Sequence, residues 1–199
     1  KHQPINNKNY HLITSSDEID EWIKEAEEVG EVAVDTETNS LDPHQADLIG
    51  ISLCSKVGKA CYIPIGHKSS KCIKKDIVIK KLKSLLEDPS VKKIGQNIKF
   101  DFIVLYKQGI TISSMEDTML MSYVLDAGKN RHNMDTLSEI HLGHKTISFK
   151  EIVGTGKKEI NFSEVEVDKA KDYAAEDADI TFRLYKKFIK NLKLEKLVN

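Results

Sequence analysis

Three short segments place carboxylates where the surrounding sequence predicts apolar side chains. In the first, Asp35 and Glu37 close the strand-like run Val32-Ala-Val-Asp-Thr-Glu. Positions two apart on a strand share a face, so both carboxylates project the same way from an element that otherwise reads as buried. Two unit charges ~4 Å apart repel by about 4 kcal/mol at an effective dielectric of 20. Either a cation lies beside them, or the strand ends at Asp35 and both acids are solvated.

The second segment is Asn97-Ile-Lys-Phe-Asp101, which we expect to belong to a helix. On such a helix Asp101 lies one turn from Asn97, and its other neighbours at three and four positions are apolar. An acid within an apolar stripe needs a partner, although the helix dipole also favours an acid near a helix N-terminus. This segment alone leaves both explanations open.

The third segment is Tyr173-Ala-Ala-Glu-Asp-Ala-Asp179, within a predicted long helix. Its core-facing stripe is predicted to comprise Ala170, Ala174, Ala178, Thr181, Tyr185 and Phe188. Asp177 lies beside this stripe, and Tyr173, one turn earlier, presents a hydroxyl on the same side. Asp179 has Arg183 four residues on, and Asp172 has charged neighbours, so both are predicted on a solvated face. Asp177 is therefore the acid that requires an explanation.

A site that binds divalent metal would explain the acids of all three segments at once. This explanation is simpler than three unrelated cases in which an acid at an apolar position happens to be solvated. Oxygen-only ligands suit Mg²⁺ or Mn²⁺ rather than Zn²⁺. Two such ions ~3.5 to 4 Å apart can hold the attacking and leaving oxygens of a phosphoryl displacement. The residue pattern thus predicts a two-metal carboxylate site, and it specifies no substrate.

The elements that carry these segments predict a mixed sheet covered by helices, an α/β fold. Turn signals separate three runs that predict consecutive antiparallel strands, and a fourth strand is short: Glu31–Thr36, Leu48–Ser55, Lys59–Ile65 and Val91–Gly95. Helical patterns cover Asp17–Glu28 (beginning near Ser15 or Ser16), Lys75–Glu87, Ile98–Lys107, Asp117–Leu125, Asp135–Leu142 and Asp168–Leu192. We expect one domain over residues 1–199.

The composition of the 199 residues, 40% hydrophobic and 31% charged, excludes disorder and coiled coil. The longest apolar stretch, Phe102 to Tyr106, is far shorter than the ~20 residues that span a bilayer. The polar start has no signal-peptide core, so we expect neither membrane insertion nor export. Three cysteines without a CxxC pair predict a reducing compartment and no thiolate zinc site.

The formal net charge of −1 argues against a nucleic-acid coat protein of high pI. The charges are nevertheless segregated: Tyr10–Asp47 carries twelve acids and one lysine, whereas Lys56–Lys99 carries twelve lysines and three acids. This segregation is consistent with an acidic locus that concentrates cations beside a basic surface that attracts phosphates. Solvated helix faces would give the same counts.

Two weaker patterns are set aside. His141 and His144 are three apart and could share a metal, but no third soft ligand lies nearby, so a capping or surface role is expected. The Gly154-Thr-Gly-Lys-Lys158 segment lacks the spacing of a Walker A loop and is predicted to be a basic loop near nucleic acid.

The three carboxylate segments resemble, in order and spacing, the motifs of the DEDD exonuclease superfamily, specifically the 3′–5′ proofreading domain of bacterial DNA polymerase I (family A). The first motif is matched by Asp35-Thr-Glu-Thr-Asn-Ser-Leu41-Asp, the second by Gly95-Gln-Asn-Ile-Lys-Phe-Asp101 and the third by Tyr173-Ala-Ala-Glu-Asp177-Ala-Asp. Because Asp172 occupies the position of the histidine in the alternative subclass, Tyr173 indicates the tyrosine subclass (DEDDy). The similarity runs from about residue 12 to residue 192.

The resemblance implies an RNase H-like fold, with a mixed sheet of roughly five strands flanked by helices, and hydrolysis of 3′ ends with two metal ions. Asp35, Glu37 and Asp177 would hold the first ion, and Asp35 would bridge to a second that Asp101 contacts directly or through water. The ions would be Mg²⁺ or Mn²⁺, with Zn²⁺ an alternative in the first site. A water oriented by Tyr173 and Glu37 would attack the terminal phosphodiester, releasing a nucleoside 5′-monophosphate without a protein nucleophile.

Substrate contacts are implied by the same resemblance. Leu41 and Phe149 match positions that wedge or stack against the terminal bases, with a role in the core as the alternative. Four further residues match positions near the substrate strand: Gln96, Asn97, Met119 and Arg131. For Arg131 the alternative is a surface ion pair.

The implied partners are a single-stranded DNA 3′ end and a polymerase domain in a longer protein. The chain contains nothing resembling a polymerase palm or fingers and does not start with methionine, so we expect an excised domain or a stand-alone relative. A monomer in the cytoplasm, associated with the nucleoid, is expected. Two alternatives remain: an RNase D-like 3′–5′ RNA exonuclease, and a non-catalytic module that binds single strands or spaces polymerase domains.

Overall fold

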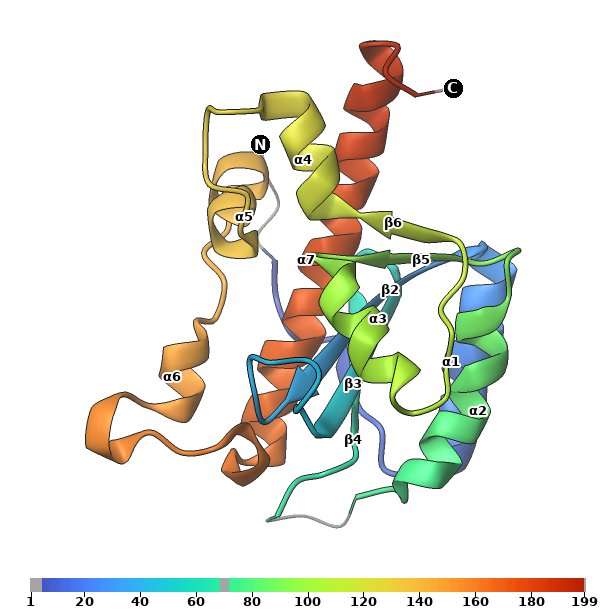
Figure 1. Cartoon of the computed structure of the whole chain (residues 1–199), viewed down its shortest axis with the longest axis vertical. Coiled ribbons are helices and arrows are strands. Elements are labelled where there is room, and N and C mark those ends of the chain that lie inside the picture. The colour runs from blue at the N-terminus through green and yellow to red at the C-terminus, as the bar shows by residue number, and fades with distance from the viewer. Residues whose placement is uncertain (1–4, 69–71, 199) are drawn as a thin grey trace.

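The computed structural model describes residues 5–68 and 72–198, and one mixed sheet runs through them (Figure 1). The strands lie in the order β1-β4-β3-β2-β5-β6. Their bounds are β1 Tyr10–Leu12, β2 Glu31–Thr38, β3 Leu48–Lys56, β4 Lys59–Pro64, β5 Lys92–Gly95 and β6 Met115–Asp117. The predicted antiparallel run is confirmed for β2, β3 and β4, while β1, β5 and β6 pair in parallel. The α/β fold is therefore confirmed, with six strands because the three-residue edge strands β1 and β6 are too short to show a pattern.

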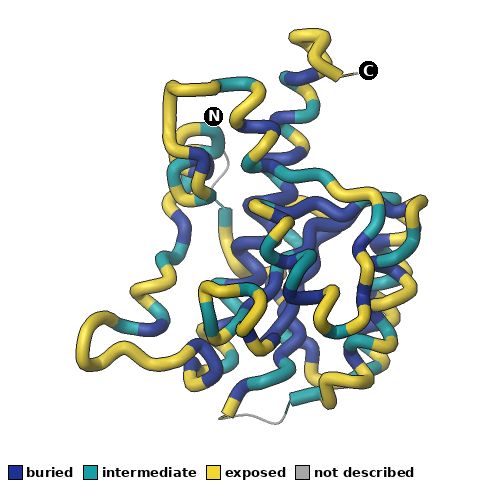
Figure 2. The backbone as a smooth tube through the Cα atoms, viewed as in Figure 1, coloured by how far each residue is buried: buried dark blue, intermediate teal, exposed yellow. Residues whose placement is uncertain are grey.

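Helices cover both faces of this sheet. Their bounds are α1 Ser16–Val29, α2 Lys75–Glu87, α3 Ile98–Tyr106, α4 Thr118–Asp126, α5 Met134–Leu142, α6 Phe149–Val153 and α7 Val167–Leu194, with 3-10 turns η1 Gly156–Lys158 and η2 Phe162–Glu164. Alternate residues of β2 divide between two cores: Val32 and Val34 pack with α1, α2 and α3, whereas Ala33 packs with α4, α5 and α7. Figure 2 shows the resulting buried layer along the sheet and α7.

Local signals explain where the helices begin and end. Ser15 caps α1 through a capping box with Glu18, as expected, and Gly30 ends that helix at φ 75°. In α7 the whole predicted apolar stripe is buried. Asp117 ends β6 and accepts the Met119 N–H as the N-cap of α4, one residue before the helix proper. None of the described helices combines the length and apolarity needed to cross a membrane.

The segregated charges of the sequence partly meet in space. Glu25 of α1 pairs with Lys56 and Lys59, and Asp20 pairs with Lys81 of α2 at 2.6 Å. These lysines are therefore engaged by acids of α1 rather than free to attract phosphates. Lys71, another of the twelve lysines, lies outside the described residues.

Candidate active site

The C-terminal half of β2 supplies the first acids. Asp35 and Glu37 continue the face of Ala33, which packs toward α7, and Asp177 of α7 approaches them from that side. One carboxylate oxygen from each of Asp35, Glu37 and Asp177 lies within 4.8 Å of the other two. The antiparallel pairing of β2 with β3 shifts register between Glu37 and Thr38, at the last residue of the strand. The strand face predicted from the sequence thus holds both acids of the first segment together.

Asp101 reaches the same end of β2 from the other face of the sheet. It is buried in α3, and its Oδ1 accepts hydrogen bonds from the Thr36 N–H at 2.9 Å and the Thr36 hydroxyl at 2.6 Å. Asn97 starts α3 with a left-handed backbone at φ 59°. Gly95 packs so closely under this turn that a Cβ there would lie 2.7 Å from the Ile98 side chain. Thr36, between the two acids of the first motif, is the positioning residue that sequence reasoning missed.

The pKa values of the carboxyl groups of Asp35, Glu37, Asp101 and Asp177 are all raised. Burial, with the charge of Asp101, raises the pKa of Glu37 to about 8. Burial also raises the pKa of Asp101 to about 7, although the Thr36 hydrogen bonds oppose the shift. The pKa values of Asp35 and Asp177 are raised well above the usual range, by burial and then by the neighbouring acids. The folded chain therefore holds these groups where negative charge is unfavourable.

The donor set fits divalent metal. No described Lys, Arg or His forms an ion pair with any of the four carboxylates. Glu37 Oε1 is buried and has no hydrogen-bond partner within the described structure. Such an orphaned oxygen in an all-carboxylate cluster is what Mg²⁺ or Mn²⁺ satisfies.

Tyr173 adds a phenol to this acidic site. It lies one turn before Asp177 on α7, and its ring contacts Phe149 and Phe162 at centroid distances of 6.1 Å. Burial and the negative charge of Asp177 raise the pKa of its hydroxyl. The phenol therefore retains its proton and is available as a hydrogen-bond donor.

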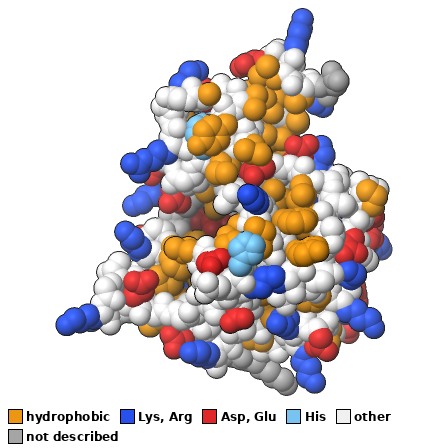
Figure 3. All heavy atoms as spheres, viewed as in Figure 1, with side chains coloured by type: hydrophobic (Ala, Val, Ile, Leu, Met, Phe, Trp, Pro, Cys, Tyr) orange, Lys and Arg blue, Asp and Glu red, His pale blue; other side chains and the backbone are white. Residues whose placement is uncertain are grey.

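A cleft of about 1170 Å³ opens beside the acids, and its walls include Glu37, Leu41, Phe149 and Tyr173. Leu41 is 95% exposed and Phe149 43%, so neither is a core residue. Figure 3 shows red carboxylate atoms recessed in a hollow of this face, with apolar side chains around it. The cleft can accommodate a chain end, with apolar surface for its bases and with Glu37 of the acidic cluster on its wall.

The other predicted substrate contacts do not line this cleft. Gln96 is engaged within the protein, since its amide donates to the His132 carbonyl at 2.8 Å and accepts from the Thr118 hydroxyl at 2.5 Å. Asn97 and Arg131 are exposed, and Met119 is half-buried on α4. Gln96, Asn97 and Met119 lie around the start of α3 and α4, and Arg131 lies in the connection between α4 and α5. None of them is on the walls that carry Leu41 and Phe149.

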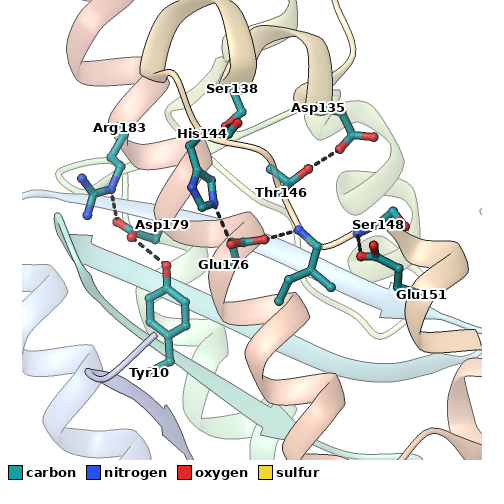
Figure 4. A network of polar contacts seen from close by, with 11 residues as sticks. Tyr10, Asp135, Ser138, His144, Thr146, Ser148, Glu151, Glu176, Asp179 and Arg183 are labelled. Carbon is teal, nitrogen blue, oxygen red and sulfur yellow. Dashed lines mark hydrogen bonds and ion pairs between the residues drawn. The ribbon is translucent and has the colours of Figure 1, made fainter. Parts of the chain in front are cut away.

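The structure contradicts the sequence predictions for Asp179 and His144. Asp179 is fully buried rather than solvated, and it accepts a hydrogen bond from the Gly58 N–H. It also accepts hydrogen bonds from the Tyr10 hydroxyl and Arg183 (Figure 4). Glu176 is also buried and contacts His144 Nε2 at 2.8 Å, so His144 is not a surface or capping residue. The i,i+4 spacing to Arg183 suggested a solvated pair because the sequence does not show that β1 and the β3–β4 turn cover it.

Comparisons with known proteins agree with this geometry. A sequence model described as 3′–5′ exonuclease matches residues 10–193. DNA polymerase I of Rhizobium leguminosarum is 42% identical over 203 residues, which cover 92% of this chain and 20% of that protein. DNA polymerase I of Pseudomonas aeruginosa is 42% identical over 182 residues, covering 88% of this chain and 20% of that protein. The chain thus spans about a fifth of the length of these relatives.

A solved structure shows the same fold at lower identity. Escherichia coli RNase D, an exoribonuclease involved in structured RNA processing, superposes with a TM-score of 0.71 at 18% identity, over 96% of this chain and 47% of that one. The six-stranded mixed sheet is thus of the RNase H-like exonuclease type. From the motifs, the gathered carboxylates and the sequence match together, the chain belongs to the 3′–5′ exonuclease family found in DNA polymerase I.

Proposed function

We propose that this exonuclease domain hydrolyses the terminal phosphodiester of single-stranded or frayed DNA 3′ ends and releases 5′-mononucleotides, as in proofreading. The observation that carries the proposal is the cluster of half-buried Asp35 with buried Glu37 and Asp177, whose carboxylate oxygens lie within 4.8 Å of one another and have no described protein cation. DNA is favoured over RNA because the relatives at 42% identity are DNA polymerases. Proofreading further requires a polymerase domain beyond this chain, and the single-domain, monomeric and cytoplasmic assignments remain predictions.

The carboxylates divide between two cation positions in this proposal. Asp35, Glu37 and Asp177 would hold one ion, and Asp35 with Asp101 would hold the other. Bound divalent ions would supply charge neutralisation at the phosphate and would lower the pKa of a bound water. Mg²⁺ or Mn²⁺ suits the all-oxygen donors, with Zn²⁺ an alternative in the first position.

The remaining residues orient the reactants. Tyr173 retains its proton and would donate a hydrogen bond, so that with Glu37 it orients the attacking water in line with the scissile bond. Leu41 and Phe149 present exposed apolar surface on the cleft wall, where stacking on the terminal bases is tolerant of sequence. No side chain of the site needs to act as a covalent nucleophile.

The test is digestion of a 5′-labelled single-stranded DNA with Mg²⁺ or Mn²⁺. We expect progressive shortening from the 3′ end, release of 5′-mononucleotides, and no activity with a chelator. Asp35→Ala is the matched control and should lower the rate by roughly 10³-fold or more, because its carboxylate serves both cation positions. Undiminished digestion by Asp35→Ala would contradict the mechanism.

A matched RNA oligonucleotide in the same assay tests the substrate class. Faster cleavage of RNA would favour an RNase D-like activity over the DNA exonuclease proposed. Absence of cleavage of either strand, together with absence of divalent-ion binding, would favour a non-catalytic binding module.

A further inference from the structure

Glu176 is a buried acid next to Asp177 on α7 whose partners lie outside the catalytic cluster. Only 6% of the residue is exposed, and both carboxylate oxygens are engaged. Oε1 contacts His144 Nε2 at 2.8 Å, and Oε2 accepts the Ile147 N–H at 2.6 Å. Figure 4 shows both contacts running from α7 to the connection between α5 and α6. The Glu176 side chain of α7 therefore contacts both His144 and Ile147 in the connection between α5 and α6.

The segment that Glu176 holds leads directly into one wall of the cleft. We call residues 144–160 the arm; it comprises the connection after α5, the short helix α6, and η1. Phe149, Lys150 and the glycine loop at residues 154–156 line the cleft beside Glu37 and Tyr173. The arm thus supplies the face of the cleft opposite the strand β2 and the loop that carries Leu41.

The rest of the arm consists of an exposed tip and a base that contacts the body of the molecule. From residue 155 to residue 161 every residue is exposed, and Figure 2 shows this stretch projecting from the body of the molecule. Elsewhere its ties are the bond from the Thr146 hydroxyl to Asp135 at 2.7 Å, the bond from Ser138 to the His144 carbonyl at 2.8 Å, the ring contacts of Phe149 with Phe162 and Tyr173, and the burial of Val153. The contact with Tyr173 is between rings, so within the described residues Glu176 supplies the hydrogen bonds that connect the arm to the helix bearing Asp177.

The arm also carries unpaired positive charge. No described carboxylate forms an ion pair with any of its four lysines, Lys145, Lys150, Lys157 and Lys158. This contrasts with the lysines near α1, which are engaged by acids. Lysines beside a cleft with an aromatic wall are the composition expected where a single strand passes.

We propose that Glu176 is a positioning residue that fixes the arm against α7, so that Phe149 and the arm lysines hold a nucleic-acid strand in register with the acids. The inference rests on the proposed function, since it concerns how the same site binds a strand. Glu176 contacts neither the reacting phosphate nor the cation positions in this account. Its removal therefore weakens strand binding more than it weakens the chemical step.

The experiment compares two substrates on wild type, Glu176→Ala and Glu176→Gln. The first is a single-stranded DNA oligonucleotide, which spans the arm. The second is the p-nitrophenyl ester of thymidine 5′-monophosphate, a phosphodiester with one nucleoside that does not reach along it. For Glu176→Ala we expect kcat/KM on the oligonucleotide to fall roughly 10- to 100-fold, mainly through KM, and at least about 10 times more than on the ester. Glu176→Gln, which keeps an acceptor for Ile147, should restore most of the loss.

A second readout does not depend on activity. Limited digestion of the folded proteins with trypsin should cut Glu176→Ala faster after Lys150, Lys157 and Lys158 than wild type. Equal losses on both substrates, or unchanged digestion in the arm, would overturn the positioning role. Failure of wild type to cleave either substrate would instead overturn the proposed function, so the two failures are distinguishable.

Discussion

Helix α7 carries two buried aspartates, two residues apart, whose surroundings are opposite. Asp179 is compensated by the protein: the Tyr10 hydroxyl and the Gly58 N–H donate to it at 2.8 Å, and Arg183 donates at 3.0 Å. Asp177 lies among Asp35 and Glu37 with no described cation, and its pKa is raised by burial and then by the charge of Glu37. Asp179 therefore stabilises the fold, whereas Asp177 lies where a bound cation would compensate its charge.

The same difference separates the functional acids from the acidic face of α1. Glu25 and Asp20 carry the same charge as the functional acids, yet each is paired with lysine. A count of acids along the chain therefore does not locate the site. The informative feature is burial without a cationic partner.

The largest effect that distinguishes Asp177 from Asp179 is expected on catalysis. Asp177→Asn removes a charge from the proposed cation site while keeping the shape of the side chain. We expect exonuclease activity to fall by roughly 10³-fold or more while the fold is retained, since the charge it removes is unfavourable in the metal-free protein. The measurement is the rate of mononucleotide release, with circular dichroism as the check on folding.

Asp179→Ala should give the reverse pattern. It leaves Arg183, the Tyr10 hydroxyl and the Gly58 N–H without their acceptor, and breaking a buried pair in this way destabilises by about 3 to 5 kcal/mol. Thermal melting should show a Tm lowered by roughly 6 °C or more. A Tm equal to that of wild type would remove the distinction between the two aspartates.

The pH dependence of the metal-free protein is the next effect in size. Glu37 titrates at about 8 in the folded chain against 4.5 for its ordinary value, so its favourable contribution is complete below about pH 4.5 and is lost as the pH rises through about 8. Glu37→Gln should therefore melt roughly 3 to 8 °C above wild type at about pH 8.5 without metal, and much closer to it at about pH 5. Identical melting curves for the two proteins at both pH values would argue against the raised pKa of Glu37.

A surface pair should give the smallest effect. Lys81→Ala removes the partner of Asp20 on the exposed side of α1 and α2, where ion pairs contribute about 0 to 1 kcal/mol. Melting of this variant should differ from wild type by no more than roughly 4 °C, with unchanged nuclease rate. A large loss of stability would mean that the pair of Asp20 and Lys81 contributes to stability as a buried ion pair does, as at Asp179, rather than as an exposed one.

The sequence predicts most of what positions the site, for identifiable reasons. Period-2 and period-3.6 patterns are long in β2 and α7, so the shared face of Asp35 and Glu37 and the inward direction of Asp177 are predictable. The edge strands β1 and β6 are too short for such a pattern. The burial of Asp179 and Glu176 depends on Tyr10, Gly58 and His144, which are more than thirty residues away along the chain, and periodicity within one helix carries no information about them.

The most direct test of the central claim is a calorimetric titration of Mn²⁺ into wild type, Asp177→Asn and Asp179→Asn at a temperature where all three are folded. Wild type should bind two ions per chain and release protons near neutral pH, because the raised carboxylate pKa values mean that metal displaces protons. Asp179→Asn should retain this binding, and Asp177→Asn should lose at least one ion. Absence of binding by wild type at millimolar Mn²⁺, or full binding by Asp177→Asn, would contradict the account.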